Sequence, residues 1–172
     1  LLCLIAKVRG ELAAPTAGEE LPSESKAFRI WRRALALAAE LLQTPKCSMQ
    51  HGGVFGLLAS TILPLLTVGS VELRDGALRC LGLACLLDRN VATQHIRILL
   101  EVMQRDCAEV QITALKGVID LLAVFSGLLD AQTTGLGVAD VVGMLVNLLD
   151  DHSSELATLA AEGLSRLFLL GR

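Results

Sequence analysis

Aromatic residues are nearly absent from this chain of 172 residues, which has one tryptophan, four phenylalanines and no tyrosine. The apolar residues are mostly leucine, alanine and valine, which favour helices packed on helices over a β-sheet. Hydrophobic residues make up 53% of the chain and charged residues only 19%. This balance excludes intrinsic disorder and allows one domain with a hydrophobic core.

The chain has no excess of positive charge, because its net charge at pH 7 is −3. It is therefore not a generally basic nucleic-acid binder, and an anionic partner would have to bind a local patch. The five cysteines are odd in number, scattered and never in C-x-x-C spacing. We expect a reduced, intracellular compartment with buried thiols. No signal peptide or initiator methionine is present, and both ends look cut, so we expect a fragment of a longer array.

Catalytic motifs are also missing: the sequence contains no G-x-S-x-G, no H-E-x-x-H and no P-loop. His51-Gly52-Gly53 is similar to part of an esterase oxyanion strand, but without a nucleophile elbow we expect a loop. Cys80 and Cys85 would lie about 140° apart on a helix and would not share a metal. The run of residues 150–152, Asp-Asp-His, is expected to be a polar turn. We predict no enzyme, catalytic residue, cofactor or metal; a hydrolase with an unrecognised site is the remote alternative.

Apolar residues at helical spacing predict a series of helices separated by short turns. Predicted caps are Asn90 at one helix start and the Asp106–Glu109 spacing of a capping box at the next. The uncharged run of residues 47–71 contains Pro64 and several glycines, so we favour a buried helix over a membrane span. The helices are predicted over residues 26–43, 55–66, 71–87, 91–104, 110–125, 138–149 and 154–170.

One phrase recurs three times, starting at Glu72, Glu109 and Glu155. Each glutamate is followed by leucine or valine, then by alanine four residues later, then by leucine or valine another four residues on. The copies are 37 and 46 residues apart, a period that suits two-helix solenoid repeats. We interpret the phrase as a packing unit, with the glutamates favoured by the helix dipole. The signature residues are Leu73, Arg74, Ala77, Leu81, Val110, Ala114, Val118, Leu156, Ala160 and Leu164.

These patterns predict an all-α fold, an α-α superhelix of the HEAT or armadillo type with at least three helix pairs. The predicted pairs cover residues 55–87, 91–125 and 138–170, and the helix 26–43 is the second half of an earlier pair. Residues 1–25 are expected to be the end of a preceding helix plus an acidic linker. Residues 26–172 are expected to be the solenoid.

The best local candidate for binding an anion such as DNA is the basic group formed by Lys26, Arg29, Arg32 and Arg33. The three arginines are neighbours on one helical face, and such a patch could neutralise phosphates. The alternative is a solvated face with the adjacent Trp31 in the core.

The pattern Leu73-Arg74…Ala77-Leu78 resembles HEAT repeats, although Gln111 and Ala157 replace the arginine in the later copies. Three further phrases, at residues 62–83, 112–120 and 154–164, resemble the G subunits of condensin in the same order along residues 28–171. One departure is the loop of residues 126–137, where that family often carries a longer acidic insertion.

The resemblance implies a non-enzymatic HEAT subunit that clasps the kleisin subunit of condensin and, with it, holds DNA in mitotic chromosome condensation. It also implies association with the SMC subunits, which carry the ATPase, and a location on chromosomes in the nucleus, with cytoplasm in interphase. No membrane or small-molecule partner is expected. The alternative is a generic HEAT or armadillo adaptor that recognises peptides in transport or signalling.

Overall fold

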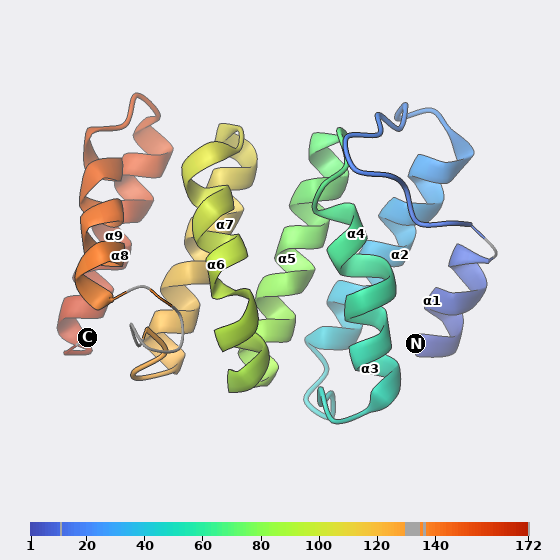
Figure 1. Ribbon diagram of the computed structural model, residues 1–172, viewed down its shortest axis with the longest axis horizontal. Coiled ribbons are helices and arrows are strands. Elements are labelled where there is room, and N and C mark those ends of the chain that lie inside the picture. The colour runs from blue at the N-terminus through green and yellow to red at the C-terminus, as the bar shows by residue number, and fades with distance from the viewer. Residues whose placement is uncertain (11, 130–134, 136, 172) are drawn as a thin grey trace. The chain divides into compact units, whose positions relative to one another are not determined.

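The chain folds into helices joined by turns in the computed structural model, which describes residues 1–10, 12–129, 135 and 137–171 (Figure 1). These described residues contain no β-strand, so the predicted all-α class is confirmed. The chain forms two compact units, Leu1–Leu87 and Asp88–Arg172, which we call unit 1 and unit 2. Within the described residues, no helix is long and apolar enough to cross a membrane.

Unit 1 is built around the contact of its two longest helices, α2 and α5. Ser25 caps the start of α2 by accepting a hydrogen bond from the Phe28 N–H at 3.0 Å, as N-cap serines do. On the other side of α2 lies α1, which therefore pairs with it (Figure 1). The helices of unit 1 are α1 (Leu2–Arg9), α2 (Lys26–Leu42), α3 (Gly52–Leu57), the π-helix η1 (Leu58–Ile62), α4 (Leu63–Leu65) and α5 (Val71–Leu87).

The acidic segment before α2 is tied to the turn between α4 and α5. The Gly18 N–H donates to the Thr67 carbonyl oxygen at 2.7 Å, and the Gly69 N–H donates to the Glu19 carbonyl oxygen at 2.9 Å. These bonds hold Gly18 and Glu19 against the turn that precedes α5. The expected division of the chain at residue 25 stays a prediction.

The helix expected over residues 55–66 starts earlier, because Gly52 and Gly53 already belong to α3. The expectation of a loop at His51-Gly52-Gly53 is therefore wrong beyond His51, which occupies the N-cap position. Before Pro64 the helix widens, and the Leu63 N–H donates to the Leu58 carbonyl oxygen, five residues back. Because Pro64 has no N–H, it cannot donate to the carbonyl oxygen of Ser60. Arg9 Nη1 donates to the Ser60 carbonyl oxygen instead, at 3.2 Å.

Unit 2 contains two further helix pairs, in which α7 packs against both α6 and α9. The predicted N-cap Asn90 is wrong, because the Asp88 carboxylate caps α6 by accepting from the Asn90 and Val91 N–H groups. The predicted capping box from Asp106 is also wrong: Cys107 is the N-cap of α7 and makes no side-chain capping bond. The helices are α6 (Arg89–Arg105), α7 (Ala108–Val124), α8 (Val138–Asn147), the 3-10 turn η2 (Leu148–Asp150) and α9 (Ser154–Leu169).

The three predicted helix pairs are present as α3–α4 with α5, α6 with α7, and α8 with α9. The pair of α1 and α2 precedes them in unit 1, so the described residues hold one pair more than the minimum predicted. Half of the predicted loop of residues 126–137 lies outside the described residues. The amphipathic pattern of residues 138–149 predicts that Val138 and Leu149 face the core. In the structure these two side chains are 48% and 38% exposed.

Candidate functional site

The repeated phrase supplies the core of both units. Its nine apolar positions are at most 7% exposed, and six of them are 0% exposed. The three alanines, Ala77, Ala114 and Ala160, are each 0% exposed, so their small size lets neighbouring helices approach closely. This burial supports a packing role for the phrase.

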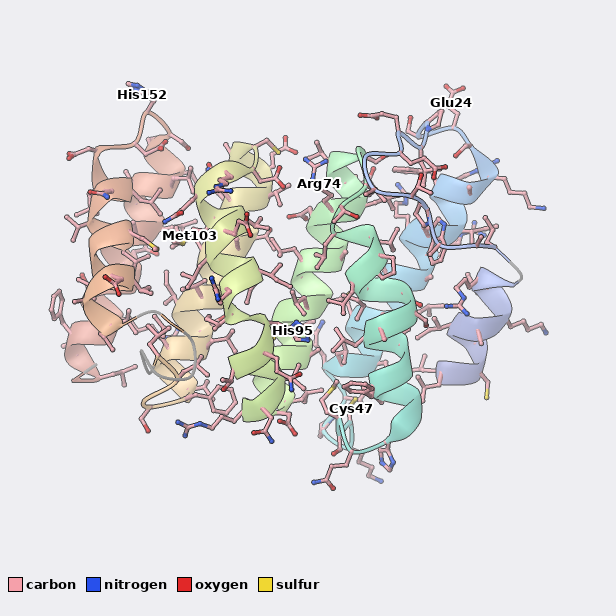
Figure 2. All side chains as sticks on the ribbon, in the orientation of Figure 1. Glu24, Cys47, Arg74, His95, Met103 and His152 are labelled. Atoms are coloured by element: carbon pink, nitrogen blue, oxygen red, sulfur yellow. The ribbon has the colours of Figure 1, made fainter. Side chains whose placement is uncertain are left out.

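Arg74 is the polar member of the phrase, and it secures the turn that precedes its own helix, α5 (Figure 2). Its Nη1 donates to the carbonyl oxygens of Val68 and Gly69 at 2.9 and 2.6 Å. A guanidinium suits this task because it offers several donors in a rigid plane. The glutamates Glu72 and Glu155 are exposed in the first turns of α5 and α9, where the helix dipole favours an anion.

The basic group lies on the solvent-facing side of α2. Arg29 and Arg33 are exposed, and the described part of the chain gives neither an acidic partner. Arg32 pairs with Glu72 of α5 at 3.2 Å, and both side chains are more than half exposed, which makes this a weak surface ion pair. Lys26, also exposed, begins the helix. These four cations form what we call the α2 basic patch.

Trp31 does not belong to the α2 basic patch. It is only 1% exposed and packs in the core of unit 1, so it cannot stack on a base. Its bulk also sets which side of α2 is buried. The helical spacing of apolar residues in α2 predicts a buried stripe of Ile30, Ala34, Leu37, Leu41 and Leu42. Ala34 and Leu42 are buried as predicted, but Ile30, Leu37 and Leu41 are only half-buried. The buried stripe instead includes Trp31. Its members are Phe28, Trp31, Ala34, Leu35, Ala38 and Leu42.

Among the described residues, no group of three His, Cys, Asp or Glu side chains could hold a metal ion. In the expected polar turn, the Asp151 carboxylate accepts from the Ser153 N–H at 2.8 Å, just before α9. His152, labelled in Figure 2, is exposed in that turn.

The cysteines divide into two classes, so the expectation of buried thiols is only partly right. Burial raises the pKa of the Cys80 and Cys85 thiols in α5 to about 12, and Cys80 Sγ donates to the Leu35 carbonyl oxygen at 3.4 Å. Cys3 and Cys107 are instead exposed, and Cys47 is half-buried, with its pKa also raised by burial.

Two apolar hollows were not foreseen from the sequence. One, of about 270 Å³, lies in unit 2 between the ends of α7, α8 and α9, with Leu122, Val141 and Leu167 in its lining. The other, of about 460 Å³, lies in unit 1 between α1 and α3. The sequence feature that could have predicted the second hollow is the glycine-rich start of α3, because glycines leave no side chains on that surface of the helix.

Comparison with known proteins places this fold. The family described as nuclear condensing complex subunits, C-terminal domain, matches residues 33–172. Condensin complex subunit 3 of Homo sapiens is 29% identical over 178 residues, covering 89% of this chain and 18% of the human protein. The subunit of the same name from Xenopus laevis is 26% identical over 180 residues, covering 81% of this chain and 17% of that protein.

Among solved structures, a chain in the crystal structure of the S. pombe condensin Cnd3–Cnd2 subcomplex is similar with a TM-score of 0.71 and 20% identity. The match covers 83% of this chain and 19% of that chain. The chain thus spans less than one fifth of the length of each of these relatives.

Proposed function

The chain belongs to the family of nuclear condensin complex subunits, in their C-terminal domain, and on this premise we propose that it is a non-enzymatic part of a HEAT-repeat scaffold. This scaffold binds the kleisin subunit of condensin and, with it, DNA during mitotic chromosome condensation. The observation that carries the proposal is the family match over residues 33–172.

Two observations support the scaffold role. The fold is that of a chain in a subcomplex named for two proteins, Cnd3 and Cnd2. In addition, the repeated phrase is used for packing, because its apolar positions are buried. A stack of helix pairs offers extended surfaces to a partner rather than an enclosed site for a reaction.

The test for the partner is purification of the tagged full-length protein from mitotic cells, followed by lysine cross-linking. We expect the kleisin and SMC subunits to be recovered, with cross-links from the kleisin to Lys26, Lys46 or Lys116 of this chain. Recovery of transport factors or coat proteins without kleisin and SMC subunits would favour the adaptor alternative and refute the proposal.

The α2 basic patch is the proposed DNA-contacting surface of this chain. Its support is the exposure of Arg29 and Arg33 on the side of α2 opposite the core. Each phosphate neutralised by a protein cation releases about 0.9 counterions from the DNA duplex, which makes binding sensitive to salt.

The test uses the assembled complex with Arg29→Glu and Arg33→Glu together. We expect DNA affinity to fall by about threefold to tenfold near 0.1 M salt, and the slope of log affinity against log salt to drop by about two. The matched control is Arg97→Glu with Lys116→Glu, which changes net charge equally at exposed positions in unit 2. An equal loss of DNA affinity in both double variants would show that the overall charge of the chain, and not the α2 basic patch, determines DNA binding.

The proposed location follows from the complex: chromosomes in the nucleus during mitosis, and cytoplasm in interphase. Imaging of a fluorescent fusion through the cell cycle tests it. Exclusion of the fusion from mitotic chromosomes would contradict the proposal.

A further inference from the structure

The hollow between α1 and α3 is an open groove along two parallel helices of unit 1. Leu2, near the start of α1, lies against Gly53, and Arg9, at its end, donates to Ser60, so the helices run side by side for the length of α1. Eight residues of α1 span about 12 Å. The lining is mainly apolar and includes Cys3, Ala6 and Leu57, with Arg9, Ser60 and Thr61 as its polar members. At about 460 Å³ the groove has room for a few aliphatic side chains.

Glycines on α3 keep this groove open. Gly53 is explained by the packing of α1, because a Cβ there would lie 2.9 Å from Leu2 Cδ1. Gly56 has no such explanation, since a Cβ there would meet nothing within 4 Å. Glycine inside a helix costs about 1 kcal/mol relative to alanine. The bare backbone at Gly56 therefore suits the close approach of a chain from outside unit 1.

The helices that line the groove carry charges of one sign. The helices that line it, α1, α3 and η1, contain no aspartate or glutamate, while α1 carries Lys7 and Arg9 in its last turn. Lys7 is exposed and lies one turn after Cys3. Arg9 lines the groove, and its buried Nε has no hydrogen-bond partner in the described part of the chain. Since the whole chain is net negative, this cationic edge is a local feature.

We infer that the groove between α1 and α3 is a docking site for a short partner peptide with aliphatic anchor residues flanked by acidic residues. The aliphatic side chains fill the space beside Gly56, and the carboxylates face Lys7 and the Arg9 end. Apolar burial supplies the affinity, and the cations select an acidic sequence over a basic one.

The first experiment measures fluorescence polarisation of a labelled peptide, Glu-Glu-Leu-Glu-Glu-Leu-Leu-Glu-Glu, with the full-length protein. We expect Gly56→Leu, which fills the groove and favours helix, to weaken binding about tenfold or more. Lys7→Glu should weaken it about threefold, and less at high salt. The matched control Ala59→Leu adds the same side chain at an exposed position that does not line the groove, and should leave affinity unchanged.

Two probe peptides test the chemistry. Serine in place of each leucine, or lysine in place of each glutamate, should abolish detectable binding. Equal binding of either peptide, or an affinity unchanged by Gly56→Leu, overturns the inference.

The second experiment uses the cysteines of the chain as reporters. Cys3 lines the groove and is exposed, whereas Cys107 is exposed in unit 2. Bound acidic peptide should slow alkylation of Cys3 by N-ethylmaleimide and leave Cys107 unchanged, as followed by mass spectrometry. If Cys3 is already unreactive in the full-length protein without peptide while Cys107 reacts, the groove is filled by the protein's own chain, and the inference is wrong.

Discussion

Unit 1 and unit 2 join their long helices by the same plan. In unit 1, α2 packs against α5, and in unit 2, α7 packs against α9. Each contact carries one exposed ion pair between the helices, Arg32 with Glu72 at 3.2 Å and Arg166 with Asp120 at 2.8 Å. Each also has a glycine where the helices meet. The two contacts nevertheless differ in how much space they leave.

The glycine contacts show that difference. A Cβ at Gly76 in α5 would lie 3.2 Å from Leu35 Cδ1, which is tight but within reach of a small adjustment. A Cβ at Gly163 in α9 would overlap Ile119 Cδ1 and lie 2.7 Å from Ile119 Cγ1. The α7–α9 contact therefore depends on the absence of a side chain at Gly163, whereas the α2–α5 contact tolerates one at Gly76. Equivalent helix contacts in the two units thus differ in whether they tolerate an added methyl group.

The two units can be followed by separate signals. Trp31, the single tryptophan, is buried in unit 1, so its fluorescence reports the unfolding of that unit. Hydrogen exchange of the α9 amides reports unit 2. The four predictions below use these signals to compare the units.

The largest effect is expected from truncating matched core leucines, Leu73→Ala in unit 1 and Leu156→Ala in unit 2. Both side chains are at most 1% exposed, so each change should lower the free energy of unfolding by about 2–5 kcal/mol through lost burial and a cavity. Urea titration followed by Trp31 fluorescence measures the first, and α9 exchange the second. Val146→Ala, at a 47% exposed position, is the control with little effect. A loss below about 1 kcal/mol at either leucine would contradict the packing role.

The sequence predicts these core positions because, in a fold of helix pairs, the buried residues of each helix recur at regular helical spacing. The spacing within each copy of the phrase is enough to place Leu73, Ala77 and Leu81 on one buried face. The spacing is only partly right in α2, where Ala34 and Leu42 are buried as expected. The bulk of Trp31 shifts the buried side of that helix and leaves Leu37 and Leu41 half-buried. Helix starts fail for a similar reason, because several residues at each boundary can serve as the cap.

The second effect concerns pH and is expected in unit 1. Burial holds the Cys80 and Cys85 thiols protonated up to about pH 12, whereas the unfolded chain releases these protons near pH 9. This stability is fully present below pH 9 and is lost as pH rises toward 12. From pH 8 to pH 10 the loss is about 1.4 kcal/mol per thiol, roughly 3 kcal/mol for both. Urea titrations at each pH, read by Trp31 fluorescence, measure it.

The matched variant for this pH effect is Cys80→Ala with Cys85→Ala. It should be less stable at pH 8 but should lose about 3 kcal/mol less between pH 8 and pH 10. Equal losses in the variant and the parent chain would rule out the thiols as the cause. Unit 2 has no buried cysteine among its described residues, so α9 exchange, corrected for its intrinsic pH dependence, should not show this component.

A smaller effect is expected from adding one methyl group at the glycines. Gly163→Ala should destabilise unit 2 by about 1–3 kcal/mol, because Ile119 must move. Gly76→Ala should be near neutral, since the gain in helix propensity of about 1 kcal/mol offsets the tight contact with Leu35. At Gly117 the nearest atom would be 3.7 Å away, so Gly117→Ala should stabilise unit 2. The expected order of the change in stability is therefore loss for Gly163→Ala, little change for Gly76→Ala and gain for Gly117→Ala. Any other order would contradict the proposed difference between the helix contacts.

The candidate sites were less accessible to sequence reasoning than the core. The exposure of Arg29 and Arg33 follows from the helix period, but the pairing of Arg32 with Glu72 joins positions far apart in the chain and needs the crossing of α2 and α5. The groove between α1 and α3 is harder still, because it is defined by missing side chains. Glycines at the start of α3 read as a loop, whereas in the structure they form a bare helical surface.

The smallest effects are expected from the two ion pairs. All four side chains are 45–61% exposed, so water screens both pairs and neither contributes much. Double-mutant cycles with alanine should give a coupling free energy of about 0.5–1 kcal/mol for Arg166 with Asp120. This value is the larger of the two because the N–O distance of this pair is shorter and its side chains are less exposed. Arg32 with Glu72 should give about 0.2–0.5 kcal/mol. Both couplings should shrink near 0.5 M salt. A larger coupling in unit 1 would mean that side-chain ordering, and not distance and exposure, determines the strength of these pairs.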